Sequence, residues 1–323
     1  MRALYFDGKL SVRDVEIPRL GPDEALIQVA FAGICGTDLQ ILKGYSSFQG
    51  IPGHEFVGRV VEAADANWIG KRVVGEINVT CRACEWCRRG LGRHCPNRTV
   101  MGIVNRPGAF AEFVALPTVN LHEVTAEIPD QSAVFTEPLA AAAEILEQLP
   151  LALSARVAVL GSGRLGLLIA QVLRHAGAEV TVIGRNAAKI ELARSWGFTC
   201  LRAGASSEGN EVPPKSFAVV VEATGSPDGL RQALSLIEPR GTIVMKSTFS
   251  ELAQFDTAKL VVDEITLMGS RCGNFVAALD LLRRGHVRVM PMVSATFALS
   301  EAAKAFAYMQ QPSCLKVLLS PGS

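Results

Sequence analysis

The sequence predicts an α/β chain of two domains, in which a β-rich domain precedes a doubly wound parallel sheet. The chain has 323 residues, and a single hydrophobic core stops growing at about 250–300 residues. Its first ~130 residues carry short apolar runs separated by Gly and Pro, whereas later runs alternate with helical stretches. These two sequence patterns predict two domains of different architecture.

The first domain is expected to be barrel-like. Its β-like runs lie at residues 25–30, 57–63 and 71–75, with turn-forming residues between them. Short strands separated by turns are typical of small barrels. From residue 131 to 149 the sequence changes to Ala, Leu and Glu, and Pro138 stands where a helix is able to begin.

The second domain is expected to contain a parallel sheet. Strand-like runs alternate with helical stretches, at residues 156–160, 179–183, 218–222 and 241–245. This alternation is typical of βαβ units with helices on both faces of a sheet. Near Cys272 the pattern changes to helices and a last strand at 315–319.

Composition and charge exclude several classes of function. The net charge of +1 gives no basic surface suited to nucleic acid or to an acidic membrane. The first residues lack the apolar segment of a secretory signal, and no apolar run reaches the ~18–20 residues of a membrane span. Eight cysteines in such a chain are expected to be metal ligands and buried thiols of a cytoplasmic protein.

A glycine-rich motif, G-x-G-x-x-G, occupies residues 161–166 between a predicted strand and a predicted helix. In this context the motif predicts a dinucleotide site. Gly161 would permit the tight turn, Gly163 a close approach to a pyrophosphate, and Gly166 close helix–strand packing. Arg164 and Leu165 lie where the helix begins, and its N-terminus would face the phosphates. The alternative is a turn that binds nothing.

The end of the next strand indicates which nicotinamide cofactor binds. NAD-dependent enzymes usually have Asp or Glu there, to bind the ribose 2′-hydroxyl. This chain has Gly184, Arg185 and Asn186 instead. Because an arginine offers a planar fork to a 2′-phosphate, NADP is predicted, and NAD is the alternative if Arg185 is only a solvated charge. Thr224, after the third strand of this domain, is expected to be a further cofactor contact.

Four cysteines form the pattern C-x2-C-x2-C-x7-C within residues 81–95, namely Cys81, Cys84, Cys87 and Cys95. The first three are spaced as in iron–sulfur ligation, but the gap before the fourth is too long for the ferredoxin pattern. Four thiolates satisfy a tetrahedral zinc and leave no open position, so the predicted role is structural. The alternative is four reduced thiols without a metal.

A second group of metal-ligating residue types is spread along the sequence: Cys35, His54, Glu55 and Glu137. Taken singly, Cys35 or His54 would more often be a core residue than a ligand. A catalytic zinc needs about three protein ligands and an open position for water or substrate. Thiolate and imidazole supply firm ligands and a carboxylate an exchangeable one, so the combination predicts a catalytic zinc.

Over essentially its whole length the chain resembles the zinc-dependent medium-chain alcohol dehydrogenases. The motifs that carry the resemblance are Cys35-Gly36-Thr37-Asp38, Gly53-His54-Glu55, the four cysteines, Thr136-Glu137-Pro138-Leu139 and the loop at 161–166. The resemblance implies a GroES-like catalytic barrel in residues 1–137, a Rossmann cofactor domain in residues 138–271, and a return to the catalytic domain in residues 272–323. The active site would lie between the two domains.

The resemblance also implies a role for each ligand. Cys35 and His54 would bind the catalytic zinc, and Glu55 would be a ligand or a close carboxylate. Glu137 stands where the ethanol-oxidising branch has a cysteine ligand and where polyol and threonine dehydrogenases have glutamate. The chain is therefore more similar to the polyol and threonine branch.

Other positions take their expected roles from the same resemblance. Asp38 would accept a hydrogen bond from the far ring nitrogen of His54 and fix its tautomer. Thr37 would hydrogen-bond the substrate hydroxyl and pass its proton outward, while Lys316 would approach the cofactor phosphates. Gln40 replaces the histidine that ends the proton relay in many members. Because glutamine does not titrate near neutrality, proton release would use water or the ribose hydroxyls.

The activity implied is reversible oxidation of a secondary alcohol, such as a polyol or sugar alcohol, with two zinc ions per chain and NADP or NAD. An L-threonine 3-dehydrogenase-like enzyme is the alternative, although Asn78 stands where that group has a histidine. A non-catalytic zinc-binding regulatory protein is a remote alternative. The expected partners are a small alcohol or carbonyl substrate and further copies of the chain, in a homodimer or homotetramer.

Overall fold

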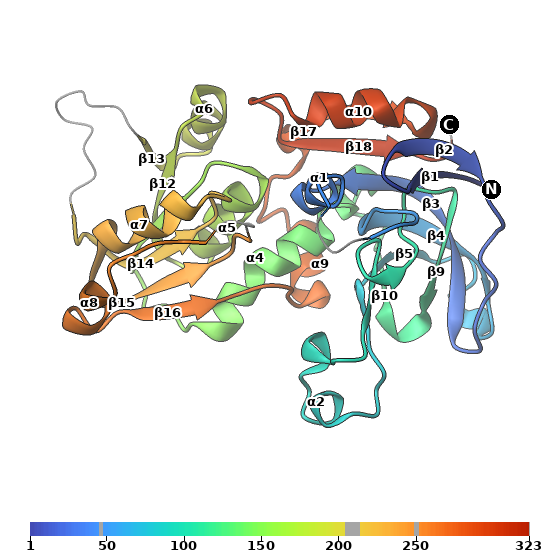
Figure 1. The fold of residues 1–323 in the computed structure, drawn as a ribbon, viewed down its shortest axis with the longest axis horizontal. Coiled ribbons are helices and arrows are strands. Elements are labelled where there is room, and N and C mark those ends of the chain that lie inside the picture. Colours follow the sequence, from blue (N-terminus) through green and yellow to red (C-terminus); the bar gives the residue numbers. More distant parts are fainter. Residues whose placement is uncertain (45–47, 204–213, 249–251, 323) are drawn as a thin grey trace. The chain divides into compact units, whose positions relative to one another are not determined.

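The computed structural model describes residues 1–44, 48–203, 214–248 and 252–322. The chain divides into two compact units (Figure 1): Met1–Glu137 with Phe275–Ser323, and Pro138–Asn274. None of the described helices is long and apolar enough to cross a bilayer.

The first unit is built on a seven-stranded sheet. Its strands run in the order β10-β5-β4-β3-β18-β17, and β9 also pairs with β3. The strands of this sheet are β3 (Glu24–Ile34), β4 (Glu55–Ala63), β5 (Arg72–Gly75), β9 (Phe113–Pro117), β10 (Leu121–Glu123), β17 (Val293–Ala298) and β18 (Lys316–Ser320). Two smaller sheets accompany it, formed by β1 (Arg2–Phe6) with β2 (Leu10–Asp14), and by β6 (Asn78–Val79), β7 (Thr99–Met101) and β8 (Asn105–Arg106).

Strand β3 is the centre of this sheet. It pairs antiparallel with β4, β9 and β18, so the last strand of the chain lies beside the third, as the red β18 beside the blue β3 shows in Figure 1. Side chains on both faces of β3 are buried, among them Ile27, Val29 and Ile34. Burial on both faces explains why its sequence is almost continuously apolar rather than alternating.

Short helices connect and cover the strands of this unit. The α-helices are α1 (Gly36–Ile41), α2 (Glu85–Arg88), α3 (Asp130–Ala133), α9 (Phe275–Arg283) and α10 (Ala302–Met309), and α4 (Thr136–Gln148) begins here and continues into the second unit. The 3-10 turns are η2 (Ala66–Trp68), η3 (Gly92–His94), η4 (Thr118–Asn120), η5 (Met290–Met292) and η6 (Leu299–Glu301).

The second unit contains one six-stranded sheet, in which every neighbouring pair is parallel. The order β13-β12-β11-β14-β15-β16 is that of a doubly wound dinucleotide fold. The strands are β11 (Arg156–Leu160), β12 (Glu179–Gly184), β13 (Thr199–Arg202), β14 (Phe217–Glu222), β15 (Ile237–Met245) and β16 (Thr266–Gly269). The connecting helices are α5 (Arg164–His175), α6 (Ala187–Ser195), α7 (Pro227–Leu236) and α8 (Thr257–Val262).

The predicted parallel sheet is confirmed for its four central strands, whose apolar runs are buried between helices. The structure adds β13 and β16 at the two edges. Both have four residues, each of them exposed or half-buried, and neither carries the continuous apolar run that marks a central parallel strand. The sequence pattern therefore did not distinguish them from loops.

Candidate functional site

Cys35, His54 and Glu55 form a compact group whose ligand atoms all lie within 4.8 Å of one another. Cys35 directly follows β3 and caps the N-terminus of α1, whereas His54 and Glu55 lie at the start of β4. Because β3 and β4 are antiparallel neighbours, with Gly33 opposite Glu55, residues about 20 positions apart in sequence meet at one end of the pair. His54 and Glu55 are both buried.

Asp38 fixes both Cys35 and His54. Its Oδ2 accepts the Cys35 backbone N–H at 2.7 Å, and its Oδ1 lies 3.4 Å from Nδ1 of His54. The second contact lacks hydrogen-bond geometry, so we describe it as an electrostatic pair. Nδ1 of His54 nevertheless points toward the fully buried Asp38 carboxylate, which leaves Nε2 as the ring nitrogen available to a metal.

The electrostatics of His54 fit a metal ligand. Burial lowers its pKa, but the Asp38 carboxylate and Cys35 outweigh this effect, so the pKa is raised well above its usual value of 6.5. A metal binds the neutral imidazole, so protons compete with a cation for Nε2 of His54. We infer that the metal affinity of this group falls as the pH is lowered.

Glu55 has two differently placed oxygens. Oε2 accepts a charge-assisted hydrogen bond from the Lys316 ammonium, and both side chains are only 1% exposed. Oε1 is buried with no hydrogen-bond partner among the described residues. An unpartnered carboxylate oxygen beside a thiol and an imidazole suits a cation, and the donor set of sulfur, nitrogen and oxygen fits zinc.

The position of Lys316 does not support its predicted approach to cofactor phosphates. Lys316 is the first residue of β18, which pairs with β3 next to Cys35. Its ammonium is buried, pairs with Glu55 and lies 5.5 Å from the centre of the Phe135 ring. The Lys316 ammonium thus lies inside the first unit, where its charge balances that of Glu55.

Two other predicted residues lie in the first turns of helices. Thr37 is in the first turn of α1, with Oγ1 4.0 Å from the Cys35 sulfur. Glu137 is the second residue of α4 and does not belong to the group of ligand atoms within 4.8 Å. The structure therefore brings Thr37 to the Cys35 thiol, and it brings Glu55 rather than Glu137 into the group of ligand atoms.

The four cysteines at 81–95 form a second compact group. The sulfur–sulfur distances are 3.5 Å for Cys84–Cys87 and Cys81–Cys95, 3.7 Å for Cys84–Cys95 and 4.0 Å for Cys81–Cys87. Four thiolates about 2.3 Å from a tetrahedral zinc would be about 3.8 Å apart. The observed distances match that value and are far too long for a disulfide, which measures about 2.05 Å.

Acidity within the four-cysteine group is uneven. The backbone N–H groups of Ala83 and Cys84 lower the pKa of the Cys81 thiol to about 6. The backbone N–H of Cys87 favours the Cys84 thiolate, but desolvation and the neighbouring sulfurs outweigh it and raise that pKa to about 11. Ionisation of one thiol thus disfavours ionisation of the next, and a divalent cation among the sulfurs would offset the repulsion between the thiolates.

The three glycines of the dinucleotide motif differ in what a side chain would meet at each position. Gly161 has φ +108°, and a Cβ on it would collide with the Ala223 carbonyl oxygen. A Cβ on Gly166 would collide with the Gly161 carbonyl, which explains the close packing of α5 on the turn. Gly163 caps α5, and a Cβ on it would meet nothing within 4 Å. That open side leaves the helix N-terminus accessible to an anion.

The turn after β12 combines local structure with exposed charge. The Asn186 side chain accepts the Lys189 N–H at 3.1 Å and caps α6, so its oxygen has a structural role. Gly184 has no room for a Cβ because the Ser162 side chain occupies that space. Arg185 is exposed, and Arg202 ends β13 in register with Gly184. Two arginines therefore lie at the ends of neighbouring strands.

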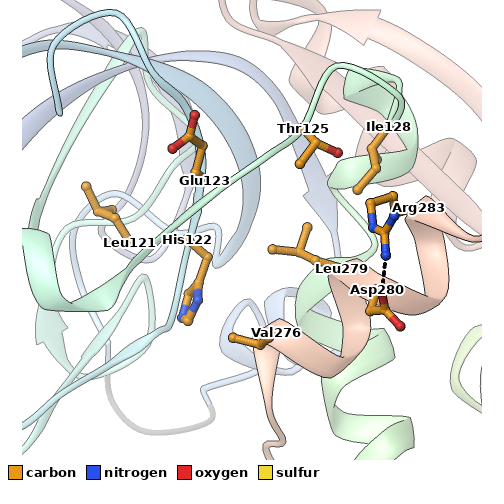
Figure 2. Close-up of a pocket in the computed structure, with 9 residues that line it drawn as sticks. All are labelled: Leu121, His122, Glu123, Thr125, Ile128, Val276, Leu279, Asp280 and Arg283. Carbon is orange, nitrogen blue, oxygen red and sulfur yellow. Dashed lines mark hydrogen bonds and ion pairs between the residues drawn. The ribbon is translucent and has the colours of Figure 1, made fainter. Parts of the chain in front are cut away.

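A pocket of about 370 Å³ in the first unit contains none of the predicted site residues (Figure 2). It lies between β10, residues 125–128 and α9, and its lining includes His122, Val276 and Leu279. His122 stacks on Phe275 at 5.4 Å and lies 3.1 Å from Glu76 Oε1. Sequence reasoning missed this pocket, because its lining residues form no motif.

Comparison with known proteins identifies the family. The alcohol dehydrogenase GroES-like domain matches residues 21–128, and the zinc-binding dehydrogenase domain matches residues 165–284. An L-threonine 3-dehydrogenase of Coxiella burnetii is 32% identical over 94% of this chain and 93% of its own length. D-arabinitol dehydrogenase 1 of Uromyces fabae is 28% identical over 99% of this chain and 97% of its own length.

Solved structures support the same assignment. A putative zinc-binding dehydrogenase of Sinorhizobium meliloti 1021 bound to NADP is 31% identical, with a TM-score of 0.90 and 99% of each chain covered. A protein of Escherichia coli CFT073 described as a short-chain alcohol dehydrogenase, in complex with NADH, is 27% identical, with a TM-score of 0.92 and the same coverage.

The chain belongs to the zinc-dependent medium-chain alcohol dehydrogenases. It is an enzyme, a zinc-dependent oxidoreductase acting on alcohols. The predicted fold class, a GroES-like domain with a Rossmann domain, is confirmed, as is the predicted family.

The Glu55–Lys316 pair generates a first prediction. Replacing Lys316 by Met leaves a buried charge on Glu55, so the free energy of unfolding should fall by about 3–5 kcal/mol. Adding Glu55→Gln should recover much of the loss. Urea unfolding with a chelator present separates this effect from metal binding.

Lys304→Met is the matched control, because Lys304 forms an exposed surface pair with Glu301 at 2.9 Å. A pair of that kind is worth at most about 1 kcal/mol. Equal losses in the Lys304 and Lys316 variants would contradict the importance of the buried pair.

Proposed function

We propose that this enzyme oxidises a secondary alcohol, specifically a polyol or sugar alcohol, and reduces the corresponding ketone, using NADP in preference to NAD. The observation that carries the proposal is the Cys35, His54 and Glu55 group at the end of the β3–β4 pair. Residues 1–137 with 272–323 would form the catalytic domain and residues 138–271 the cofactor domain. The 28% identity to an arabinitol dehydrogenase favours a polyol substrate.

Each residue of the site has a task in this reaction. Cys35 and His54 would hold the catalytic zinc, with Glu55 or Glu137 as the exchangeable ligand. Bound zinc supplies Lewis-acid stabilisation of the alcohol oxygen. Asp38 orients His54, and Thr37 takes the hydroxyl proton of the substrate.

Other parts of the chain would release the proton and bind the cofactor. The side chain of Gln40 has no titratable group near neutrality, so the proton from Thr37 would pass to water or to a ribose hydroxyl. The loop at 161–166 would hold the cofactor that accepts the hydride, with its phosphates at the N-terminus of α5.

A threonine dehydrogenase-like activity is the second candidate. The 32% identity to an L-threonine 3-dehydrogenase favours it. Asn78 weighs against it, because this buried residue replaces the histidine expected in that group. L-threonine carries an ammonium and a carboxylate group at neutral pH, whereas a polyol carries no charged group, so the two candidates differ in the substrates they accept.

The proposed function is tested with a panel of secondary alcohols, polyols and amino alcohols, each assayed with NADP and NAD. We expect the highest kcat/KM for a polyol with NADP. Arg185→Ala should weaken NADP selectively, by roughly 1–3 kcal/mol, because it removes a charge-assisted contact to the 2′-phosphate. A higher kcat/KM with NAD in the unmodified enzyme would contradict the NADP preference.

Gly184→Asp is a less informative test of cofactor preference, because the structure leaves no room for a side chain at Gly184. An aspartate there would repel a 2′-phosphate, but its Cβ would first displace Ser162 in the glycine loop. We therefore expect Gly184→Asp to weaken both cofactors, so that Arg185→Ala is the more informative change. Arg202, whose exposed side chain lies on the neighbouring strand end, is the control for a general loss of positive charge.

We further propose two zinc ions per chain with unequal roles. Metal analysis of protein purified without chelator should give close to two. Cys81→Ser should lose folding or solubility, because residues 81–95 depend on the metal for their structure. Cys35→Ser should stay folded with one zinc and without turnover. A single zinc in both the unmodified protein and Cys35→Ser would exclude two sites.

Glu137 is proposed to lie at or beside the exchangeable zinc position. Glu137→Ala should lower kcat or zinc retention and leave cofactor binding nearly unchanged. Glu137→Cys should retain zinc and alter the substrate range, because it restores a common ligand type of the family. If Glu137 only stabilises the first turn of α4 through the helix dipole, Glu137→Ala will reduce stability and leave kcat intact.

A homodimer or homotetramer is also proposed. Among the strands that the structure describes, β16 pairs only with β15 and so forms one edge of the parallel sheet, and Leu267 on it is 42% exposed. Val261 and Val262 on the preceding helix α8 are 76% and 80% exposed. Exposed apolar side chains beside an open sheet edge favour association with a second copy. A monomeric mass in light scattering would contradict it.

A further inference from the structure

Glu222 is a fully buried carboxylate that no motif accounts for. It is the last residue of β14, in the unit that holds the glycine loop, and it is 0% exposed. Oε1 accepts two hydrogen bonds from Thr224, one from the backbone N–H at 2.7 Å and one from the hydroxyl at 2.5 Å. Oε2 is buried without a hydrogen-bond partner among the described residues. Burying a carboxylate costs free energy unless its oxygens are paired, and one oxygen of Glu222 lacks a partner among these residues.

The carboxylate holds the loop between β14 and α7, residues 223–226. The Thr224 oxygen accepts the Ser226 N–H at 3.2 Å, so the Glu222 contact continues to the N-cap of α7. Gly225 N–H donates to Ser247 Oγ at 2.8 Å, which fixes the loop from the side of β15. The N–H and the O–H of Thr224 thus both donate to Glu222, which argues against donation from the hydroxyl to a cofactor.

This loop lies directly against the dinucleotide turn. A Cβ on Gly161 would meet the Ala223 carbonyl oxygen and, at 3.2 Å, the Thr224 nitrogen. A displacement of residues 223–224 would therefore move the wall against which the glycine turn packs.

A helical glycine makes room for the pair. Gly229 is in the first turns of α7, and a Cβ on it would collide with Glu222 Oε1 and Thr224 Oγ1. Glycine inside a helix is less favourable than alanine by about 1 kcal/mol. The segment thus combines a partly unpaired buried carboxylate with a poor helix former. Departures from local stability rules concentrate at functional sites.

We propose that Glu222 is a positioning residue for the nicotinamide cofactor: through Thr224 it holds residues 223–226 in the conformation that the bound cofactor requires. The proposal rests on the proposed function, since it takes the glycine loop as the cofactor site. A loop that is ordered before binding loses less conformational entropy when the cofactor arrives. Without the acceptor, Thr224 is free to turn, and binding must order the loop.

The test measures the dissociation constants of NADPH and NADH by titration calorimetry with the zinc-loaded, full-length enzyme. Glu222→Ala should raise both roughly tenfold or more, because it removes two hydrogen bonds to a charged acceptor. Glu222→Gln should bind within about threefold of the unmodified enzyme, since its amide oxygen accepts both Thr224 bonds. Equal weakening in both variants would overturn the acceptor role.

Val221→Ala is the matched control for stability. Val221 is also fully buried on β14, and its truncation should lower Tm without changing cofactor affinity. If Glu222→Ala lowers Tm in the same way and binds both cofactors as the unmodified enzyme does, the carboxylate is only structural and the proposal fails.

Gly229→Ala gives a test that does not depend on the Glu222 variants folding. Alanine favours the helix, but its methyl group would push against the Glu222 and Thr224 oxygens, so cofactor affinity should fall. In the Glu222→Ala background the same change should have a smaller further effect, because the Glu222 oxygen is absent and Thr224 is free to turn away from the methyl group. Unchanged affinity in Gly229→Ala would overturn the proposal.

These outcomes are distinct from failure of the proposed function. If the unmodified enzyme binds neither NADPH nor NADH, the cofactor site itself is wrong and the positioning role falls with it. If the unmodified enzyme binds a cofactor and the Glu222→Ala and Gly229→Ala variants bind it equally well, only the role of Glu222 is wrong.

Discussion

The antiparallel pairing of β3 with β4 and with β18 is the constraint on which the metal group depends. These pairs place Cys35, Glu55 and Lys316 at neighbouring strand ends, although the first and last are separated by most of the chain. The register is important because a slip of one residue would turn each side chain to the opposite face. Gly33 opposite Glu55 leaves the space that the carboxylate occupies, since a Cβ there would meet Glu55 Oε2 at 2.5 Å.

Charge within this part of the core is tolerable only as a balanced set. Asp38, His54, Glu55 and Lys316 are all nearly inaccessible to solvent. Burying one of them alone would be strongly unfavourable, but opposite charges lie beside each other: Asp38 faces His54, and Glu55 faces Lys316. The unpartnered Oε1 of Glu55 is the remaining imbalance, and it lies where the thiol and imidazole converge. A divalent cation bound there would balance this remaining charge.

Features with a local cause were predictable from the sequence. The glycine loop, the four-cysteine pattern and the central strands each follow from spacing or apolar runs over a few residues. The Glu55–Lys316 pair was not predictable, because it depends on β18 joining the first sheet in one register across 261 residues of sequence. The edge strands β13 and β16 were missed because they are short and exposed. The candidate ligands Cys35, His54 and Glu55 were identified from their residue types and by resemblance, and their convergence is a property of the fold.

The two groups of candidate metal ligands, one within residues 81–95 and one around Cys35, differ in how the chain holds them. At 81–95 the four sulfurs lie within one short segment, and two of the cysteines begin or follow single helical turns. Four thiolates would fill the coordination shell of a zinc there, so such a site would be closed, and the metal would stabilise the segment. The Cys35 group instead is held by strands whose cores exist without a metal, and its ligands come from two strand ends with unequal donors. A rigid frame of that kind is able to leave one coordination position for a substrate oxygen, because it does not need the metal to fold.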